Sequence, residues 1–241
     1  MRKDFNVGKM DALIVGDVQK DFCLGGALPV PRGDEVIPAL NDYIKIFKKA
    51  NARIFATRDW HPPNHVSFKA QGGPWPPHCI QNSEGAQFHP DLKLPSATTI
   101  VSKAMDPLKE AYSGFEGTDL AGTLKKKGVT RVFVGGLTTD YCVKNTVLDA
   151  RKLGFDVVLL MDAIRGINVK PGDVAKAIDS MIESGAEQGT LADFPDPLEI
   201  PLSENAEAER LSDKPLSKLE MKKKARMRPR GPYKRIRTER G

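Results

Sequence analysis

The chain has 241 residues, 40% of them hydrophobic and 28% charged, and a formal net charge of +6, which is sufficient for one substantial core. No apolar run is long enough for a signal peptide or a membrane-spanning helix, and the three cysteines (Cys23, Cys79 and Cys142) lack the spacing of a disulfide framework. These features exclude the membrane-spanning and the disulfide-rich secreted classes, and we expect an intracellular protein located in the cytoplasm.

Short apolar segments alternate with amphipathic helical patterns along the chain. Strands are expected at residues 11–15, 53–57, 99–101, 131–135 and 156–161, with a sixth near 187–190, and helices at 35–50, 119–127, 145–153 and 174–184. Such alternation predicts an α/β fold of three layers, in which helices cover both faces of a mostly parallel sheet. The segment from residue 58 to 97 has many Pro and Gly residues and little periodicity, which favours a long functional loop.

Three of the expected strands are followed by residues that can carry chemistry. Asp17 follows the first strand, Lys103 follows the third, and Cys142 lies beyond the fourth, in a glycine-containing turn at the first turn of a helix. Because the carboxyl ends of parallel strands meet at one edge of the sheet, the acid, the ammonium and the thiol are expected to face one crevice. Considered singly, each has an ordinary alternative: a turn-forming acid, a solvated lysine and a buried cysteine.

Together these three groups have the chemistry of amide hydrolysis. Asp17 could take the thiol proton and later return it to a leaving amine. The Lys103 ammonium would keep the carboxylate ionised and, with the positive end of the following helix, would favour the thiolate of Cys142. Backbone N–H groups between Thr138 and Cys142 could receive the oxyanion of a tetrahedral intermediate. The expected reaction therefore proceeds through a thioester.

A second group of polar residues lies in the long loop. Asp59 and His61 are two residues apart, so in an extended segment their side chains point the same way and can share a metal ion, with His78 as a third ligand. A set of three ligands leaves coordination positions open for water or substrate. The alternative is that these residues only make hydrogen bonds within the loop. His65 is either a fourth ligand or a support of the loop.

In five segments the chain resembles the cysteine hydrolases of the isochorismatase-like superfamily and, within it, the nicotinamidases. The resemblance covers residues 12–192 and rests on five motifs in the order of the family: Asp17-Val-Gln-Lys-Asp-Phe22, Thr57-Arg-Asp-Trp-His-Pro-Pro-Asn-His65, Gly73-Pro-Trp-Pro-Pro-His-Cys79, Lys103 with Tyr112-Ser-Gly-Phe115, and Gly136-Leu-Thr-Thr-Asp-Tyr-Cys142. It implies the isochorismatase-like hydrolase fold. It also implies hydrolysis of nicotinamide to nicotinate and ammonia, a step of pyridine nucleotide (NAD) metabolism.

The resemblance implies a role for each matching residue of the catalytic centre. Asp17 would be the proton shuttle, Lys103 its charge partner and Cys142 the nucleophile that forms the thioester. The oxyanion would be held by the backbone amides of Thr138 and Cys142, and a cis peptide bond would join Leu137 to Thr138.

The resemblance also implies a cofactor and a substrate pocket. One divalent metal ion (Zn, Fe or Mn) on Asp59, His61 and His78 would bind the pyridine nitrogen of nicotinamide. An aromatic pocket for the ring would be lined by Phe22, Trp75 and Tyr112, although aromatic residues also serve ordinary core packing.

The C-terminal segment differs from the rest of the chain in charge. Residues 203–241 hold 13 Lys and Arg against 6 Asp and Glu, whereas residues 1–202 hold 24 against 25. We therefore predict an isochorismatase-like catalytic domain at 1–202 and a basic, disordered tail at 203–241. A tail of this kind could bind nucleic acid or an anionic surface weakly, although charge runs are usually only solvated.

Two other functions stay open at this point. The chain could be another hydrolase of the superfamily that acts on a different small amide, or a catalytically idle interaction protein that uses its basic tail. The combination of catalytic and metal-ligand residues favours the nicotinamidase over both. The identity of the metal, the oligomeric state and the activity on analogues of nicotinamide do not follow from the sequence.

Overall fold

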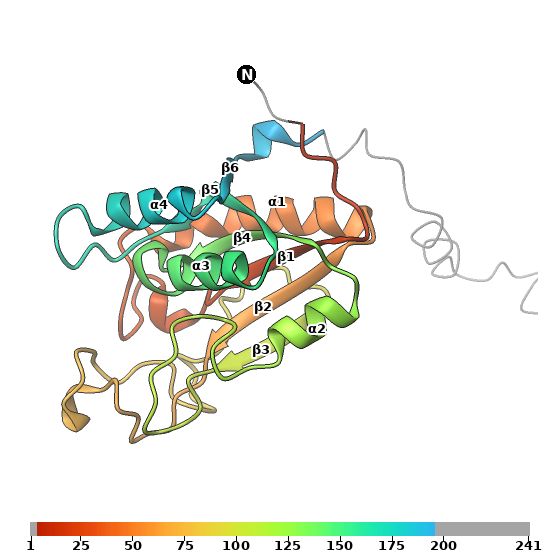
Figure 1. Cartoon of the computed structure of the whole chain (residues 1–241). Helices are drawn as coiled ribbons and strands as arrows, with labels where there is room; N and C mark the ends of the chain where they lie inside the picture. The colour runs from red at the N-terminus through yellow and green to blue at the C-terminus, as the bar shows by residue number, and fades with distance from the viewer. Residues whose placement is uncertain (1–3, 196–241) are drawn as a thin grey trace, which may run out of the picture. The chain divides into compact units, whose positions relative to one another are not determined.

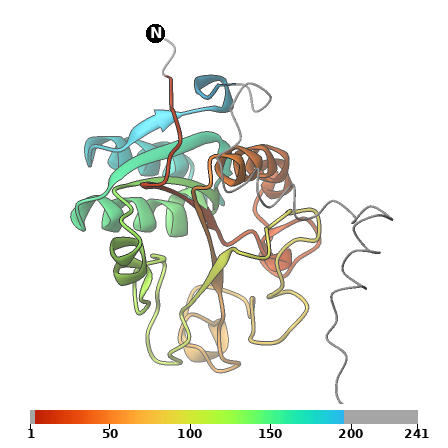
Figure 2. The same ribbon diagram turned by 90° about the vertical axis from the view of Figure 1, so that its right-hand side faces the viewer.

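The computed structural model describes residues 4–195, which form a single sheet with helices on both sides (Figures 1 and 2). The predicted boundary between residues 202 and 203, and the whole of the basic tail, lie outside the described residues. Within the described part, none of the helices has the length and apolar character needed to cross a membrane.

The sheet has six strands in the order β3-β2-β1-β4-β5-β6, and every neighbouring pair is parallel. The strands are β1 (Asp11–Gly16), β2 (Arg53–Asp59), β3 (Thr99–Lys103), β4 (Arg131–Leu137), β5 (Asp156–Arg165) and β6 (Glu187–Gly189). The chain starts in the middle of the sheet, builds outward to β3, and then returns to place β4 on the other side of β1. Open α/β sheets bind ligands at such a reversal.

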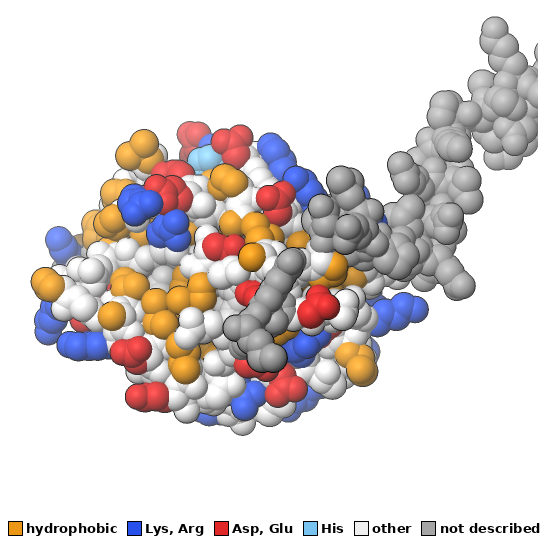
Figure 3. Space-filling model, turned by 90° about the horizontal axis from the view of Figure 1, so that it is seen from above, with side chains coloured by type: hydrophobic (Ala, Val, Ile, Leu, Met, Phe, Trp, Pro, Cys, Tyr) orange, Lys and Arg blue, Asp and Glu red, His pale blue; other side chains and the backbone are white. Residues whose placement is uncertain are grey.

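Helices cover both faces of the sheet, so the predicted three-layer α/β fold is confirmed. Helix α1 (Val36–Lys49) lies on one face, and α2 (Leu120–Lys126), α3 (Lys144–Lys152) and α4 (Asp173–Glu183) lie on the other (Figure 2). Each face has its own hydrophobic core. On the surface seen in Figure 3, acidic and basic side chains are interspersed, which suits the near balance of charge in residues 1–202.

Strand β1 illustrates how the apolar sequence produces this arrangement. All six of its residues are buried. Leu13 and Val15 belong to the core under α1, whereas Ala12 and Ile14 belong to the core under α2 and α3. Alternate residues of a strand point to opposite faces, so a strand that is buried on both faces requires an uninterrupted apolar run.

The predicted strands and helices are all present, but several strands are longer than their apolar patterns. Strands β2 and β3 remain paired as far as Asp59 and Lys103, and β4 and β5 as far as Leu137 and Arg165. The backbone pairing therefore continues past the point where the apolar pattern stops. Cys142, expected in the first turn of a helix, lies in a π-helical turn (Thr139–Val143) that leads directly into α3.

The close approach of β1 and β4 depends on a glycine. Gly136 has a φ of +125°, and its register partner in β1 is Gly16. A β-carbon on Gly136 would lie 2.1 Å from the carbonyl oxygen of Gly16. The register of β4 against β5 also shifts between Val134 and Gly136. Only glycine satisfies both the positive φ and the contact between the two backbones.

Substituting Gly136→Ala is expected to lower the free energy of unfolding by about 2 kcal/mol or more, because the new methyl group meets backbone atoms that cannot move aside. Gly8→Ala is the matched control, since a β-carbon there approaches only Asp11, at 4.0 Å. Chemical denaturation of both variants provides the measurement. Equal denaturation midpoints for the two would contradict this account.

Candidate active site

Three ionisable side chains converge at the carboxyl edge of the sheet, where β1, β3 and β4 end. Asp17 directly follows β1, Lys103 is the last residue of β3, and Cys142 lies in the turn after β4. Lys103 Nζ is 3.1 Å from Asp17 Oδ2 and 3.4 Å from Cys142 Sγ, and all three residues are buried. The crevice expected from the sequence therefore brings these three side chains together.

The carboxylate of Asp17 is held by the neighbouring strand β2. Thr57 Oγ1 donates a hydrogen bond to Asp17 Oδ1 at 2.6 Å, and the Asp17 amide donates to the Thr57 carbonyl at 3.2 Å. Asp17 has a φ of +48°, which turns the chain at the end of β1. Sequence analysis did not find Thr57, although the parallel register pairs it with Gly16, next to Asp17.

The ammonium of Lys103 connects two acids. Besides its contact with Asp17, it donates a hydrogen bond to Asp59 Oδ1 and one of 3.3 Å to the carbonyl of Ala111. The resemblance paired Lys103 with Asp17 only. The contact with Asp59 arises because β2 and β3 place these two residues in register at their carboxyl ends.

Burial and neighbouring charges shift the pKa values of the candidate catalytic group, which consists of Asp17, Lys103 and Cys142. Burial raises the pKa of Cys142 well above its ordinary value, and the lowering effect of Lys103 does not reverse the shift. Burial also raises the pKa of Asp17 against the lowering effect of Lys103. For Lys103, burial lowers the pKa, but Asp17 and Asp59 outweigh it, so that the pKa lies well above its usual value.

These shifts favour an ammonium on Lys103 and a protonated thiol on Cys142. The sequence predicts that Lys103 and the helix N-terminus favour the thiolate of Cys142, whereas burial shifts the pKa of this thiol in the opposite direction. The physical reason is that one ammonium, shared among several acidic partners, does not offset the loss of hydration of a fully buried thiolate. If this sulfur acts as a nucleophile, its proton would have to pass to a base.

The turn that carries Cys142 is anchored by the carbonyl of Thr138. This carbonyl accepts hydrogen bonds from the amides of Tyr141 at 3.2 Å and Val143 at 3.0 Å. The peptide bond between Leu137 and Thr138 is cis, as the resemblance implied. Thr138 and Cys142 both line the pocket described below, so the two amides suggested for the oxyanion belong to one turn beside it.

Asp59, His61 and His78 form a second cluster next to the catalytic group. One ligand atom of each lies within 4.8 Å of the others, and all three residues are buried. His61 Nε2 is 3.6 Å from Asp59 Oδ2, and neither ring nitrogen of His61 has a hydrogen-bond partner among the described residues. A buried polar group without a partner is unfavourable, and a metal ion would satisfy it. The donor set therefore fits a divalent ion.

The surrounding hydrogen bonds leave a ligand atom available on each side of His61. His78 Nδ1 lies 2.8 Å from the carbonyl of Pro76, so Nδ1 carries the proton and Nε2 keeps its lone pair. Asp59 Oδ1 is occupied by Lys103, whereas Oδ2 faces His61. Burial raises the pKa of Asp59, but the opposite effects of Lys103 and His61 are larger, so the pKa lies below its ordinary value. The carboxyl group is therefore ionised, as a metal ligand must be.

His65, left open by the sequence, has no free ring nitrogen in this arrangement. Its Nδ1 lies 2.7 Å from Ser67 Oγ, and its Nε2 lies 3.1 Å from the carbonyl of Lys109. Its ring also lies against that of His61, with 4.3 Å between centroids. These contacts make His65 a support of the loop that carries His61.

Gln19 holds the end of β2 in place and was not identified from the sequence as a site residue. Its Nε2 donates to the carbonyls of Asp59 at 2.8 Å and Ala86 at 2.9 Å, and its Oε1 accepts the amide of Asp59 at 2.8 Å. Gln19 is fully buried. It therefore fixes the backbone of Asp59 from the loop that follows the neighbouring parallel strand β1.

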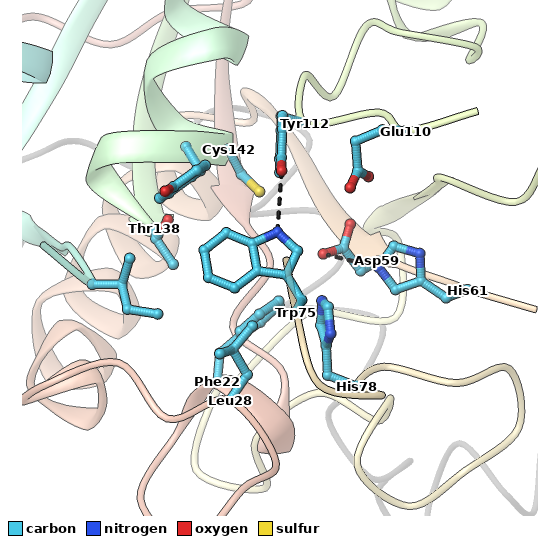
Figure 4. A pocket seen from close by; sticks show the side chains of 12 residues that line it. Phe22, Leu28, Asp59, His61, Trp75, His78, Glu110, Tyr112, Thr138 and Cys142 are labelled. Atoms are coloured by element: carbon cyan, nitrogen blue, oxygen red, sulfur yellow. Dashed lines mark hydrogen bonds and ion pairs between the residues drawn. The ribbon is translucent and has the colours of Figure 1, made fainter. Parts of the chain in front are cut away.

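A pocket lies between the catalytic group and the metal cluster (Figure 4). Its lining consists of Phe22, Leu28, Asp59, His61, Trp75, His78, Glu110, Tyr112, Thr138, Tyr141, Cys142 and Ile167. The three aromatic residues expected there are among them, and the dashed line in Figure 4 marks the hydrogen bond from Trp75 Nε1 to the Tyr112 hydroxyl, 3.1 Å long.

Four of the lining residues were missed by sequence analysis: Leu28, Glu110, Tyr141 and Ile167. Two of them had a usable signal, because Tyr141 adjoins Cys142 and Ile167 follows β5 at the same carboxyl edge. Leu28 and Glu110 lie on loops whose path only the folded chain defines.

Comparison with known proteins agrees with the fold and the site. Residues 11–193 match the Isochorismatase domain, and the chain belongs to this family. The nicotinamidase of Escherichia coli (strain K12) is 41% identical over 204 residues, which cover 76% of this chain and 96% of that protein.

Two solved structures are similar in fold as well as in sequence. The pyrazinamidase of Pyrococcus horikoshii in complex with zinc is 54% identical, with a TM-score of 0.73, and the match covers 76% of this chain and 99% of that one. PnC1 from L. infantum in complex with nicotinate is 35% identical, with a TM-score of 0.74, and the match covers 79% of this chain and 98% of that one.

Proposed function

We propose that this protein is a nicotinamidase, which hydrolyses nicotinamide to nicotinate and ammonia. The observation that carries the proposal is the pocket in which Cys142 and a three-ligand metal cluster face one cavity with aromatic sides. Nicotinamide offers the two groups that such a pocket needs on one flat ring: a carboxamide for the thiol and a pyridine nitrogen for a metal ion. The likeness to the E. coli nicotinamidase and to the nicotinate-bound L. infantum protein supports it.

In the proposed mechanism, Cys142 is the nucleophile and Asp17 moves the proton. As Sγ attacks the carboxamide carbon, its proton passes to Asp17, and the new oxyanion is held by the amides of Thr138 and Cys142. Asp17 then gives this proton to the nitrogen as the C–N bond breaks, which releases ammonia and leaves a thioester. Asp17 next takes a proton from water, the water oxygen attacks the thioester, and Asp17 returns the proton to the departing sulfur.

Asp59, His61 and His78 would hold one divalent ion. When bound, such an ion would accept the lone pair of the pyridine nitrogen and so orient the ring. Zinc is the first ion to test, because the P. horikoshii pyrazinamidase is in complex with zinc, although Fe and Mn also accept His and Asp ligands. Phe22, with its ring 5.5 Å from that of His78, would pack against the bound ring.

Cys142→Ala is expected to reduce turnover of nicotinamide by at least about 10³-fold, because no other side chain can form the thioester. Cys79→Ala is the matched control, since Cys79 is also fully buried but lies outside the pocket. Ammonia release by both variants, with circular dichroism to verify folding, provides the measurement. Wild-type turnover by a folded Cys142→Ala protein would rule out the covalent mechanism.

Thr57→Val is expected to raise the pKa of Asp17, because the hydrogen bond from Thr57 lowers it. The carboxylate that accepts the thiol proton then forms at higher pH. The acid limb of the kcat/KM profile should move to higher pH, with a loss of about tenfold at neutral pH. Thr57→Ser retains the hydroxyl and should retain the wild-type profile. If Thr57→Val and wild type gave the same profile, Thr57 would have no part in positioning Asp17.

Chelation of the metal is expected to raise the KM for nicotinamide strongly, with a loss of about 10²-fold in kcat/KM, because the ring is no longer held at its nitrogen. His61→Ala and His78→Ala should each have the same effect. Benzamide lacks the ring nitrogen, so it should be a poor substrate whether metal is present or absent. Undiminished hydrolysis of nicotinamide by the metal-free protein and by both variants would leave only a structural role for these residues.

A further inference from the structure

A second group of side chains that can bind a metal ion lies outside the pocket, where the segment that follows Phe22 meets His89. Cys23, Asp34 and His89 each offer one ligand atom, and the three atoms lie within 4.8 Å of one another. Cys23 is buried, whereas the side chains of Asp34 and His89 are 40% and 20% exposed. None of the three lines the pocket or takes part in the proposed mechanism.

Hydrogen bonds with backbone groups hold Asp34 and His89 in place. The carboxylate of Asp34 accepts a hydrogen bond from the amide of Leu24, 3.1 Å from Oδ2, which ties it to the residue after Cys23. The amide of His89 donates to the carbonyl of Val18 at 2.9 Å. The three ligands therefore come from separate stretches of chain that other contacts already bring together, as a preformed site requires.

The spacing within this cluster matches that of the first cluster. His89 Nε2 is 3.8 Å from Asp34 Oδ1, and His61 Nε2 is 3.6 Å from Asp59 Oδ2. An ion with metal–ligand distances of about 2 Å spans either separation. The thiol distinguishes the second cluster, because a set of sulfur, nitrogen and oxygen donors favours a borderline-soft ion such as Zn²⁺ over Mg²⁺ or Ca²⁺.

We propose that Cys23, Asp34 and His89 form a second metal site, for zinc or a similar divalent transition metal. The exposed sides of Asp34 and His89 give the ion a path from solvent and leave room for a water ligand. Cys23 and Asp34 bracket the loop that carries Leu28, and Phe22 precedes it; both Phe22 and Leu28 line the pocket. An ion bound here fastens both ends of this loop to His89 and so stabilises that side of the pocket.

Metal binding at this site replaces the proton of the thiol. Burial and the neighbouring Asp34 raise the pKa of Cys23 to about 12, so the metal-free thiol is protonated. Formation of the metal–sulfur bond breaks the S–H bond and releases one proton to solvent for each ion bound.

His89 must bind the ion through Nε2 and carry its proton on Nδ1. Nδ1 accepts a hydrogen bond from the amide of Asp91 at 3.2 Å, and the carboxylate Oδ2 of Asp91 is 4.0 Å away. The Asp91 side chain is 74% exposed and therefore free to rotate. When the ion binds, the Asp91 carboxylate replaces the Asp91 amide as the partner of His89 Nδ1. A carboxylate that accepts the other ring N–H is the usual support of a metal-bound imidazole.

The test uses the full-length protein, stripped of metal and titrated with Co²⁺, whose thiolate complexes have a charge-transfer band in the near ultraviolet. The first cluster has no sulfur ligand, so the band reports the second site. The wild-type protein should bind two equivalents of Co²⁺ and show the charge-transfer band. The His61→Ala protein should bind one equivalent and still show the band. Cys23→Ser should bind one equivalent without it. Cys79→Ser and Cys142→Ser are matched controls that should retain the band.

Zn²⁺ should displace this Co²⁺, and Asp91→Ala should weaken Zn²⁺ binding about tenfold or more. If Cys23→Ser fails to fold, His89→Ala, at a partly exposed position, serves in its place and should lose the same band. The proposal is overturned if wild type shows no thiolate band, if the band persists in the folded Cys23→Ser and His89→Ala proteins, or if the second equivalent binds without saturation. These outcomes do not depend on whether the protein hydrolyses nicotinamide.

Discussion

The buried ammonium of Lys103 is the interaction on which the site depends. It lies against Asp17, Asp59 and Cys142, and the whole residue is 1% exposed. Buried charges are tolerated only when they are paired, and here one cation faces two carboxyl groups. Loss of one member of a buried ion pair typically costs about 3–5 kcal/mol, because the charge that remains has neither water nor a partner. Lys103 therefore constrains the fold as well as the chemistry.

Lys103 also makes the two halves of the site interdependent. Asp59 gives one oxygen to this ammonium and directs the other toward His61. The position of this proposed metal ligand therefore depends on the same cation that contacts Cys142. The coupling follows from topology, since parallel strands in register bring Asp59 and Lys103 to the same edge. A displacement of β3 would move the acid, the thiol and the metal cluster relative to one another.

Sequence reasoning succeeded where local pattern and topology decide. Apolar runs located the strands, and the rule that carboxyl ends share one edge placed Asp17, Lys103 and Cys142 together. It missed Thr57 and Gln19, which stand inside quoted motifs but show no local sign of their role. Only the register of β2 against β1 puts the Thr57 hydroxyl on Asp17, and only the folded loop puts Gln19 against the end of β2. The lining residues Leu28 and Glu110 depend in the same way on loop paths that no periodicity encodes.

The protonation of Cys142 shows the same limit. The sequence indicates only groups that favour its thiolate, whereas burial raises the pKa of the thiol. In a hydrated site, a lysine and a helix N-terminus lower the pKa of a neighbouring thiol. The depth of burial, however, is a property of the tertiary structure, and here burial raises the pKa of Cys142. A neutral thiol needs a base within the same dry group, which is the place that Asp17 occupies. In the proposed mechanism, the proton that leaves sulfur goes to the departing nitrogen by way of Asp17, so the buried group would complete the reaction without a net change of charge. A site that had to gain or lose a charge in this surrounding would face the full desolvation penalty at each step.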